Sequence, residues 1–255
     1  MMQLTDSHAH LDDESFANDR KEVIDRARQA GVTNIVVPAV DRASWNRIAA
    51  LQDRQKGVHA AYGMHPMFLN QHRPEHLDQL PEWLENHPAV AIGEIGLDYF
   101  VEGLDAEKQR HYFQSQLAIA RDLKLPVIVH ARRAVDEVIS SIRQMGGLTG
   151  VVHSFSGSQQ QAEQLWKAGF LIGLGGPLTY ERAQRLRRIV TDMPLEYLLL
   201  ETDAPDQPGS NHRGERNEPA HIVDVLQTVA SLRNELPDTI AEATTNNARR
   251  LFRFP

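Results

Sequence analysis

Short apolar runs alternate with longer amphipathic stretches along the whole chain. The apolar runs predict eight strands, near residues 4–10, 34–39, 59–63, 90–96, 126–130, 150–155, 170–175 and 197–202. Several runs are almost continuously apolar, among them Val127-Ile128-Val129 and Leu198-Leu199-Leu200. Such runs are typical of parallel strands that are buried on both faces of the sheet.

The stretches between these runs have helical spacing. They predict helices over residues 16–30, 43–55, 74–86, 106–123, 135–145, 159–168, 181–191, 219–232 and 237–251. Strands that alternate with helices favour the α/β class, and eight of them favour a (β/α)8 TIM barrel with an extra C-terminal helix. An open, doubly wound sheet is the alternative. The longest irregular segment, residues 204–219, then covers the mouth of the barrel.

Length and composition fit this interpretation. The 255 residues suit one barrel, and no Pro-, Gly- or Ser-rich linker divides them, so we expect a single domain over residues 1–255. The start of the chain lacks a signal-peptide pattern, and no apolar stretch approaches the roughly 20 residues of a membrane span. Together with the absence of cysteine, this favours a cytoplasmic protein that does not bind membranes. A monomer is compatible with the sequence, which does not fix the oligomeric state.

The charge and the residue types restrict the chemistry. The net charge of −7 argues against broad adhesion to nucleic acid, although a local cationic cleft stays open. Without cysteine, any metal ion must be held by histidines and carboxylates. His8 and His10 are two positions apart in a predicted strand, where alternate side chains share a face. They can therefore point at one ion.

Further histidines and carboxylates fall where other strands end. In a barrel the carboxyl ends of the strands form the active-site face. The polar residues predicted at those ends are His8, His10, His65, Glu94, Asp98, His130, Arg132, His153, Glu201 and Asp203. Each alone has an ordinary structural explanation, such as a satisfied core histidine, an ion pair or a turn cap. Together they predict a metal site, because burying so many unpaired polar groups would be costly.

The natural arrangement is a dinuclear site. His8, His10 and Asp203 would hold one divalent ion, His130 and His153 would hold the other, and Glu94 would bridge them. Two ions about 3.5–4 Å apart can share a hydroxide that attacks phosphorus or a carbonyl carbon. Asp203 has a second predicted role as the general base, so Glu94 and Asp203 are the predicted catalytic residues.

Seven segments carry a resemblance to a known family. They are residues 6–10 (DSHAH), 63–66 (GMHP), 93–98 (GEIGLD), 126–132 (PVIVHAR), 152–157 (VHSFSG), 200–205 (LETDAP) and 213–219 (RGERNEP). With these motifs the chain resembles the TatD family of metal-dependent deoxyribonucleases, closest to its YjjV branch, within the amidohydrolase-like superfamily. The resemblance covers essentially the whole chain. It implies a barrel with a dinuclear site, hydrolysis of phosphodiester bonds in DNA, and ligand roles for the same six residues.

Two further residues are predicted to contact substrate. Arg132 can orient a phosphate oxygen through its planar donors, or it can be surface charge at a helix start. His65 can contact substrate, or Gly63–Pro66 can be only a rigid turn. Arg132, Arg182, Arg213 and Arg216 form either a basic rim for DNA or scattered surface charge.

The predicted cofactor is a pair of divalent ions. Histidine-rich ligation suits Zn, Mn or Co, and the family resemblance admits Mg as well. Two such ions bring four positive charges, and Glu94, Asp203 and a bridging hydroxide remove three, so about one positive charge remains. This favours DNA or a small phosphodiester as substrate. The alternatives are a carboxylic ester, lactone or amide hydrolase on the same site, and a non-catalytic metal-binding barrel.

Overall fold

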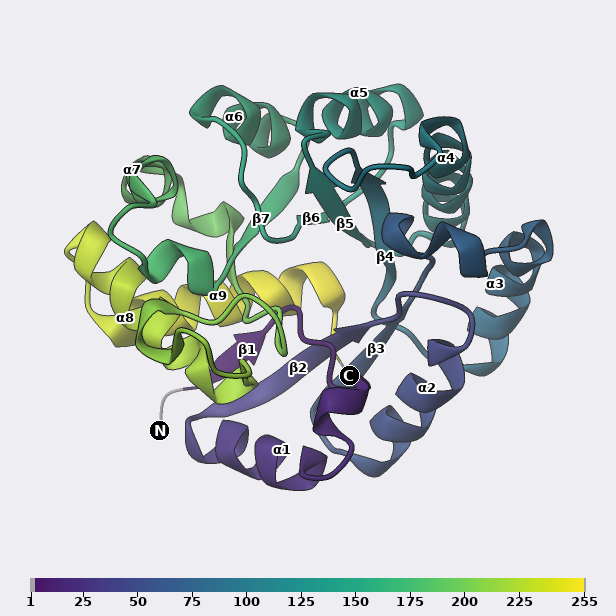
Figure 1. Cartoon of the computed structure of the whole chain (residues 1–255). Coiled ribbons are helices and arrows are strands. Elements are labelled where there is room, and N and C mark those ends of the chain that lie inside the picture. The colour runs from purple at the N-terminus through teal and green to yellow at the C-terminus, as the bar shows by residue number, and fades with distance from the viewer. Residues whose placement is uncertain (1–2, 255) are drawn as a thin grey trace.

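The computed structural model describes residues 3–254, and its strands form one parallel eight-stranded sheet. Each strand is hydrogen-bonded to the next in chain order, and Figure 1 shows the sheet rolled up inside a ring of helices. The strands are β1 (Leu4–Asp6), β2 (Val32–Pro38), β3 (Val58–Tyr62), β4 (Ala91–Asp98), β5 (Val127–Arg132), β6 (Gly150–Val152), β7 (Phe170–Leu174) and β8 (Leu198–Leu200). The predicted TIM barrel is confirmed. The open sheet is wrong, because its strand order would reverse at a switch point.

Helices lie between the strands, as the sequence predicts. They are α1 (Arg20–Gln29), α2 (Ser44–Arg54), α3 (Pro74–Asn86), α4 (Ala106–Leu123), α5 (Val135–Met145), α6 (Gln159–Lys167), α7 (Gln184–Asp192), α8 (Ile222–Arg233) and α9 (Pro237–Phe252). The first helix begins later than predicted, because Glu14–Phe16 form a separate 3-10 turn. Asp13 caps that turn through the Ser15 N–H at 2.8 Å.

The extra C-terminal helix, yellow in Figure 1, closes the end of the barrel where the strands begin. Asn247 of α9 donates to the carbonyls of Leu195 and Leu198 at 2.8 and 2.9 Å, and Thr245 donates to the carbonyl of Gln3 at 3.0 Å. The apolar side of α9 packs on residues inside the barrel, namely Val36, Ala61, Ile128, Val151, Leu171 and Leu199. Because one end is filled with apolar side chains, polar chemistry is confined to the other end.

The first and last strands meet at a seam that is joined irregularly. The Ser7 N–H donates to the Leu200 carbonyl at 3.0 Å, and the Asp203 N–H donates to the His8 carbonyl at 2.9 Å. Buried Asp6 also accepts from the Thr202 hydroxyl at 2.6 Å. These contacts bring the segment after β1 beside the segment after β8.

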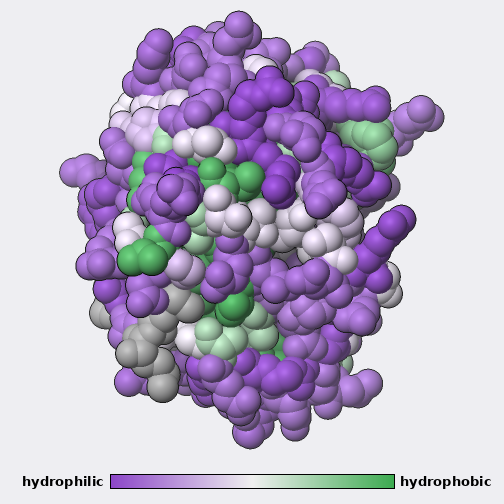
Figure 2. Space-filling view, turned by 90° about the vertical axis from the view of Figure 1, so that its left-hand side faces the viewer, coloured by the Kyte–Doolittle hydropathy of each residue, from purple (hydrophilic) through white to green (hydrophobic). Residues whose placement is uncertain are grey.

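The outer surface is mainly polar. Figure 2 shows the side of the molecule that carries α7 and α8, where hydrophilic residues cover most of the face and hydrophobic ones form small groups. Within residues 3–254, no helix combines the length and the apolar character that a membrane crossing needs. This agrees with amphipathic helices that turn only one side to the core.

Candidate metal centre

The six predicted ligands meet at the carboxyl ends of the strands. His8 and His10 follow β1, Glu94 lies in β4, His130 lies in β5, His153 follows β6, and Asp203 follows β8. A cavity of about 830 Å³ opens at this end, and its lining includes His10, Glu94, His130, His153 and Asp203. The barrel therefore brings together residues that are distant in sequence.

The structure corrects how the first histidine pair is positioned. The β1 ladder ends at Asp6, so His8 and His10 do not lie within a regular strand. The chain stays extended beyond it, because the Ala9 N–H donates to the Val36 carbonyl at 3.0 Å and the His10 N–H donates to the Ala204 carbonyl at 2.7 Å. These bonds to both neighbouring segments keep the two rings on one side.

The first donor group consists of His8, His10 and Asp203. The two histidine Nε2 atoms are 3.1 Å apart, and they lie 3.4 and 3.6 Å from Asp203 Oδ1. Glu94 Oε2 completes the group, at 3.2 Å from His8 Nε2 and 3.4 Å from His10 Nε2. The Gln207 amide donates to the other carboxylate oxygen of Asp203 and fixes its orientation.

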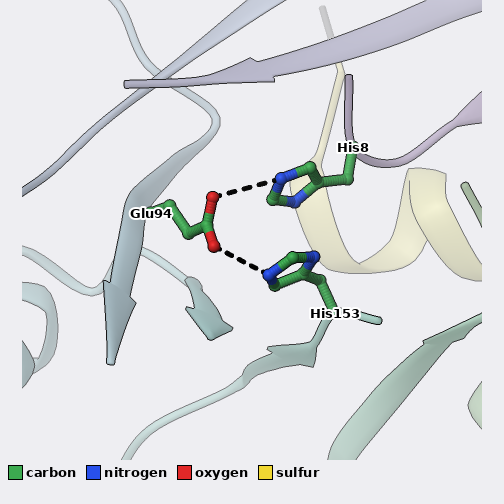
Figure 3. Close-up of side chains that lie close together, drawn as sticks. All are labelled: His8, Glu94 and His153. Atoms are coloured by element: carbon green, nitrogen blue, oxygen red, sulfur yellow. Dashed lines mark ion pairs between the residues drawn. The ribbon is translucent and has the colours of Figure 1, made fainter. Parts of the chain in front are cut away.

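The second donor group consists of His130 and His153, which face the other oxygen of Glu94. Glu94 Oε1 lies 2.7 Å from His153 Nε2 and 3.2 Å from His130 Nδ1. The two ring nitrogens are 3.3 Å apart. Figure 3 shows the Glu94 carboxylate between His8 and His153, with one oxygen directed at each ring. A carboxylate placed in this way has the orientation of a bridge between two sites.

The donor spacing fits metal ions. Nitrogen and oxygen ligands at about 2.1 Å from a tetrahedral ion are about 3.4 Å apart. In the first group, the five distances given above run from 3.1 to 3.6 Å. All donors are imidazole nitrogens or carboxylate oxygens, which suit borderline and hard divalent ions. The residues present therefore fit the metal that the motifs predict.

The buried charge of Glu94 also indicates that positive charge is needed between the donor groups. Burial by itself would raise the pKa of Glu94, but His153, His65 and His8 hold that pKa well below its usual range. Burial opposes protonation of His10, yet the hydrogen bond and charge of Glu94 raise its pKa to about 9. A buried carboxylate that stays ionised needs protons or metal ions around it.

Two buried carboxylates behind the second group received no role from the sequence. His130 Nε2 donates to Asp98 Oδ2 at 2.9 Å, which leaves the Nδ1 lone pair directed at Glu94 and the second group. Asp98 Oδ1 accepts from the N–H groups of Phe100 and Val101 at 2.8 and 3.1 Å. Although burial opposes it, these bonds lower the pKa of Asp98 to about 2. Strand alternation was the available signal, because it places Asp98 on the same face as Glu94.

Glu201 is the second of these carboxylates. Its Oε1 accepts from the Ser154 N–H at 2.6 Å and lies 3.9 Å from His153 Nδ1. Its Oε2 packs against Gly173, where a β-carbon would be only 2.0 Å away, so a side chain at position 173 would displace the Glu201 carboxylate. Glu201 thus lies behind the His153 ring on the side away from Glu94.

His65 lies closer to the donors than a simple turn residue would. Its Nε2 is 2.9 Å from Glu94 Oε1. Its Nδ1 accepts the Met67 N–H at 3.1 Å, so Nε2 carries the ring proton and donates. A nitrogen that carries a proton is not a metal ligand, and this distinguishes His65 from His130, whose proton faces away.

Arg132 is the last residue of β5 and lines the cavity, so it does not lie at a helix start. Its guanidinium lies over the Phe100 ring, 3.7 Å from the ring centroid. Arg216, in contrast, is held in pairs with Asp19 and Glu218 at 2.6 and 2.9 Å, so it ties the loop after β8 to α1. The suggested basic rim does not include it as a free charge.

The comparisons with known proteins agree with this geometry. A family model described as "TatD related DNase" matches residues 5–253 of the chain. The chain belongs to the TatD family. The resemblance expected from its motifs is confirmed over nearly its whole length.

One relative of this TatD-family chain is similar in both sequence and structure. A protein of Escherichia coli (strain K12), "Uncharacterized metal-dependent hydrolase YjjV", is 42% identical over 253 residues, which are 98% of each chain. The crystal structure of the E. coli TatD homologue YjjV matches with a TM-score of 0.95 at 40% identity, and covers 99% of this chain and 98% of that one.

A second relative bears the name "3'-5' ssDNA/RNA exonuclease TatD". It comes from Erwinia billingiae (strain Eb661) and is 34% identical over 258 residues, which cover 98% of this chain and 99% of that one. As a member of the TatD family, this chain is a metal-dependent hydrolase.

Proposed function

We propose that this chain is a deoxyribonuclease that hydrolyses phosphodiester bonds with two divalent ions. The observation that carries the proposal is the buried carboxylate of Glu94, which presents one oxygen to each of two donor groups. His8, His10 and Asp203 would hold one ion, and His130 and His153 would hold the other. Such ions polarise a phosphoryl oxygen and make a coordinated water more acidic.

The charge of the site favours an anionic substrate. Two divalent ions bring four positive charges against the two carboxylates of the donor groups. Arg132 adds a guanidinium at the cavity wall, and the planar donors of arginine match phosphate oxygens. A neutral ester or amide would leave this excess positive charge without a partner.

Three side chains have proposed roles beside the ions. Asp203 takes a proton from the attacking water at Oδ2, which keeps a lone pair beside the Gln207 amide. His65 donates a hydrogen bond from its Nε2–H to a phosphate oxygen. The backbone N–H of Met67 occupies Nδ1, so the ring proton stays on Nε2. Arg132, which also lines the cavity, orients the phosphate.

The test is an assay of metal-stripped protein with Mg, Mn, Co or Zn added back singly. The substrates are single-stranded DNA, a simple phosphodiester such as bis(p-nitrophenyl) phosphate, and a lactone. We expect metal-dependent cleavage of DNA and of the simple diester. Lactone hydrolysis without cleavage of either diester would overturn the proposal in favour of a carboxylic ester hydrolase. Binding of metal with no turnover of any substrate would favour a non-catalytic barrel.

A further inference from the structure

An exposed aromatic ring lies beside two arginines, one of which, Arg132, lines the metal cavity. Phe100 follows β4 and is 44% exposed, which is unusual for a phenylalanine. The guanidinium carbons of Arg132 and Arg133 are 3.7 and 4.7 Å from the centroid of its ring. Burial does not explain this aromatic residue, but stacking with a ligand would.

A second groove adjoins the metal cavity on the side of Arg133. It has a volume of about 640 Å³ and is lined by residues that include Tyr99, Arg133, Ser156, Ser158 and Arg185. Ser156 lines both spaces, so the two adjoin. The first turns of α5 and α6 border the groove and turn the positive ends of the helix dipoles toward it.

Of the two acids that line this groove, only Glu137 is paired with a cation, whereas Asp136 is hydrogen-bonded to a neutral amide and keeps its charge. Asp136 accepts from the Gln161 amide at 2.7 Å, and Glu137 accepts from Arg110 at 2.5 Å. In the part of the chain that the structure describes, Arg132, Arg133 and Arg185 form no ion pair. Arg185 does donate to the Ser156 carbonyl at 2.6 Å, but that bond leaves its charge in place. These three guanidiniums outnumber the single carboxylate of Asp136, and the local excess of positive charge favours an anionic ligand.

The carboxylate of Asp98 is hydrogen-bonded both to the backbone of Phe100 and to a histidine of the metal centre. Asp98 accepts from the Phe100 N–H through Oδ1 and from the His130 ring through Oδ2.

Arg133 has a φ of +55°, a conformation that residues with a β-carbon rarely adopt. An arginine at such a position is more readily explained by its side chain than by its backbone.

We propose that Phe100, Arg132 and Arg133 form a nucleotide platform for single-stranded DNA. The base next to the phosphodiester that is cleaved stacks on Phe100, and the following phosphates lie along Arg133 and Arg185. An aromatic ring stacks only on a base whose face is free, so the platform selects single strands over duplex. The inference rests on the proposed function, because it assigns the substrate of the same site.

The test for stacking compares an oligodeoxynucleotide with the same strand in which abasic sites replace the bases. For Phe100→Ala we expect kcat/KM to fall about tenfold on the intact strand and to stay unchanged on the abasic strand. Leu123→Ala is the matched control, because Leu123 is 43% exposed at the far end of α4. An equal loss on both strands, or no loss on either, overturns the platform.

The test for the phosphate contact uses salt dependence. Arg133→Gln should lower kcat/KM on both strands and reduce the slope of log(kcat/KM) against log[NaCl] by about 0.7, which corresponds to one phosphate contact on single-stranded DNA. Arg54→Gln, an exposed arginine at the end of α2, is the control and should leave the slope unchanged. An unchanged slope for Arg133→Gln overturns this contact.

Failure of the platform differs from failure of the proposed function. If wild-type protein cleaves no phosphodiester with any metal, the proposed function fails. If wild-type protein cleaves the intact and the abasic strands equally well, and Phe100→Ala does so too, the function stands and the platform fails.

Discussion

The two donor groups share Glu94 but are supported in different ways. His130 lies within the β5 ladder, and its ring is held by the buried carboxylate of Asp98. His8 and His10 lie beyond the end of β1, and within residues 3–254 His8 Nδ1 has no hydrogen-bond partner. The second group thus has one ring fixed before an ion arrives, whereas the first depends on backbone contacts across the seam between β1 and β8.

If each donor group binds an ion, as we propose, the difference in support makes them two kinds of metal site. A ring whose tautomer is fixed by a carboxylate is a stronger ligand than one that must be oriented on binding. We therefore expect the second group to bind its ion more tightly than the first. Four experiments test this comparison.

We expect the largest loss of activity from a substitution that changes both donor groups at once. Glu94→Gln takes the shared negative charge from both, so kcat should fall about a thousandfold or more and bound metal should decrease at both sites. Kinetics and metal analysis by mass spectrometry measure the two effects. Glu102→Gln, an exposed residue on the loop after β4, is the control. Full activity of Glu94→Gln would contradict the shared role.

Asp203→Asn separates the groups. Asparagine keeps the shape but loses the charge and the basic oxygen, so kcat should fall about 10²- to 10⁴-fold. The ion held by His130 and His153 should remain, and circular dichroism should show an unchanged fold. Loss of both ions with this change would mean that the two groups are not supported independently.

Asp98→Asn acts on the second group alone. The asparagine oxygen can keep the bonds to Phe100 and Val101, but its amide would donate to His130 Nε2. The ring proton would then move to Nδ1, the atom that faces the ion. We expect affinity for one ion to weaken about 10- to 100-fold in calorimetric titrations.

Asp105→Asn is the matched control for that change, because Asp105 caps α4 and asparagine caps equally well. Equal weakening of both ions by Asp98→Asn would contradict the comparison, and so would an unchanged affinity.

The smallest effect concerns the loop that follows Asp203. The hydrogen bond from Arg216, with help from Arg26, lowers the pKa of exposed Asp19 to about 2. Because this pKa is below the ordinary value of 3.8, the pair stabilises the fold fully above about pH 4 and is lost as the pH falls toward 2. Arg216→Gln should lower Tm by only a few degrees at pH 7.

The difference in Tm between Arg216→Gln and wild type should shrink as the pH falls from 4 toward 2. Thermal melts of the metal-free proteins over this range measure it. A difference that is constant with pH would assign the effect to packing of the arginine rather than to its charge.

The fold could be predicted because buried parallel strands have nearly continuous apolar runs in the sequence. The carboxyl ends of such strands converge, so histidines and carboxylates at those ends could be grouped without any contact information. This reasoning works for Glu94 and His130, which lie within the strands β4 and β5.

What the sequence did not reveal depends on contacts between distant segments. The predicted fourth strand ended at Gly96, but the ladder with β5 continues to Asp98, and Gly96 permits it because a β-carbon would lie 2.0 Å from the His130 carbonyl. Strand alternation places Asp98 on the face of Glu94, but its contact with His130 follows only from that pairing. Likewise, no local pattern shows that Arg216 is paired with Asp19, 197 positions away.

The seam between β1 and β8 also determines when the site can form during synthesis of the chain. Ser7 and Leu200, which meet there, are 193 positions apart. A chain emerging from the ribosome cannot assemble His8, His10 and Asp203 until nearly all of it has been made. An ion held by them would link the first strand to the last, as a cross-link that closes a very long loop does. Its capture would mark the completed chain, and its removal would speed unfolding from the seam.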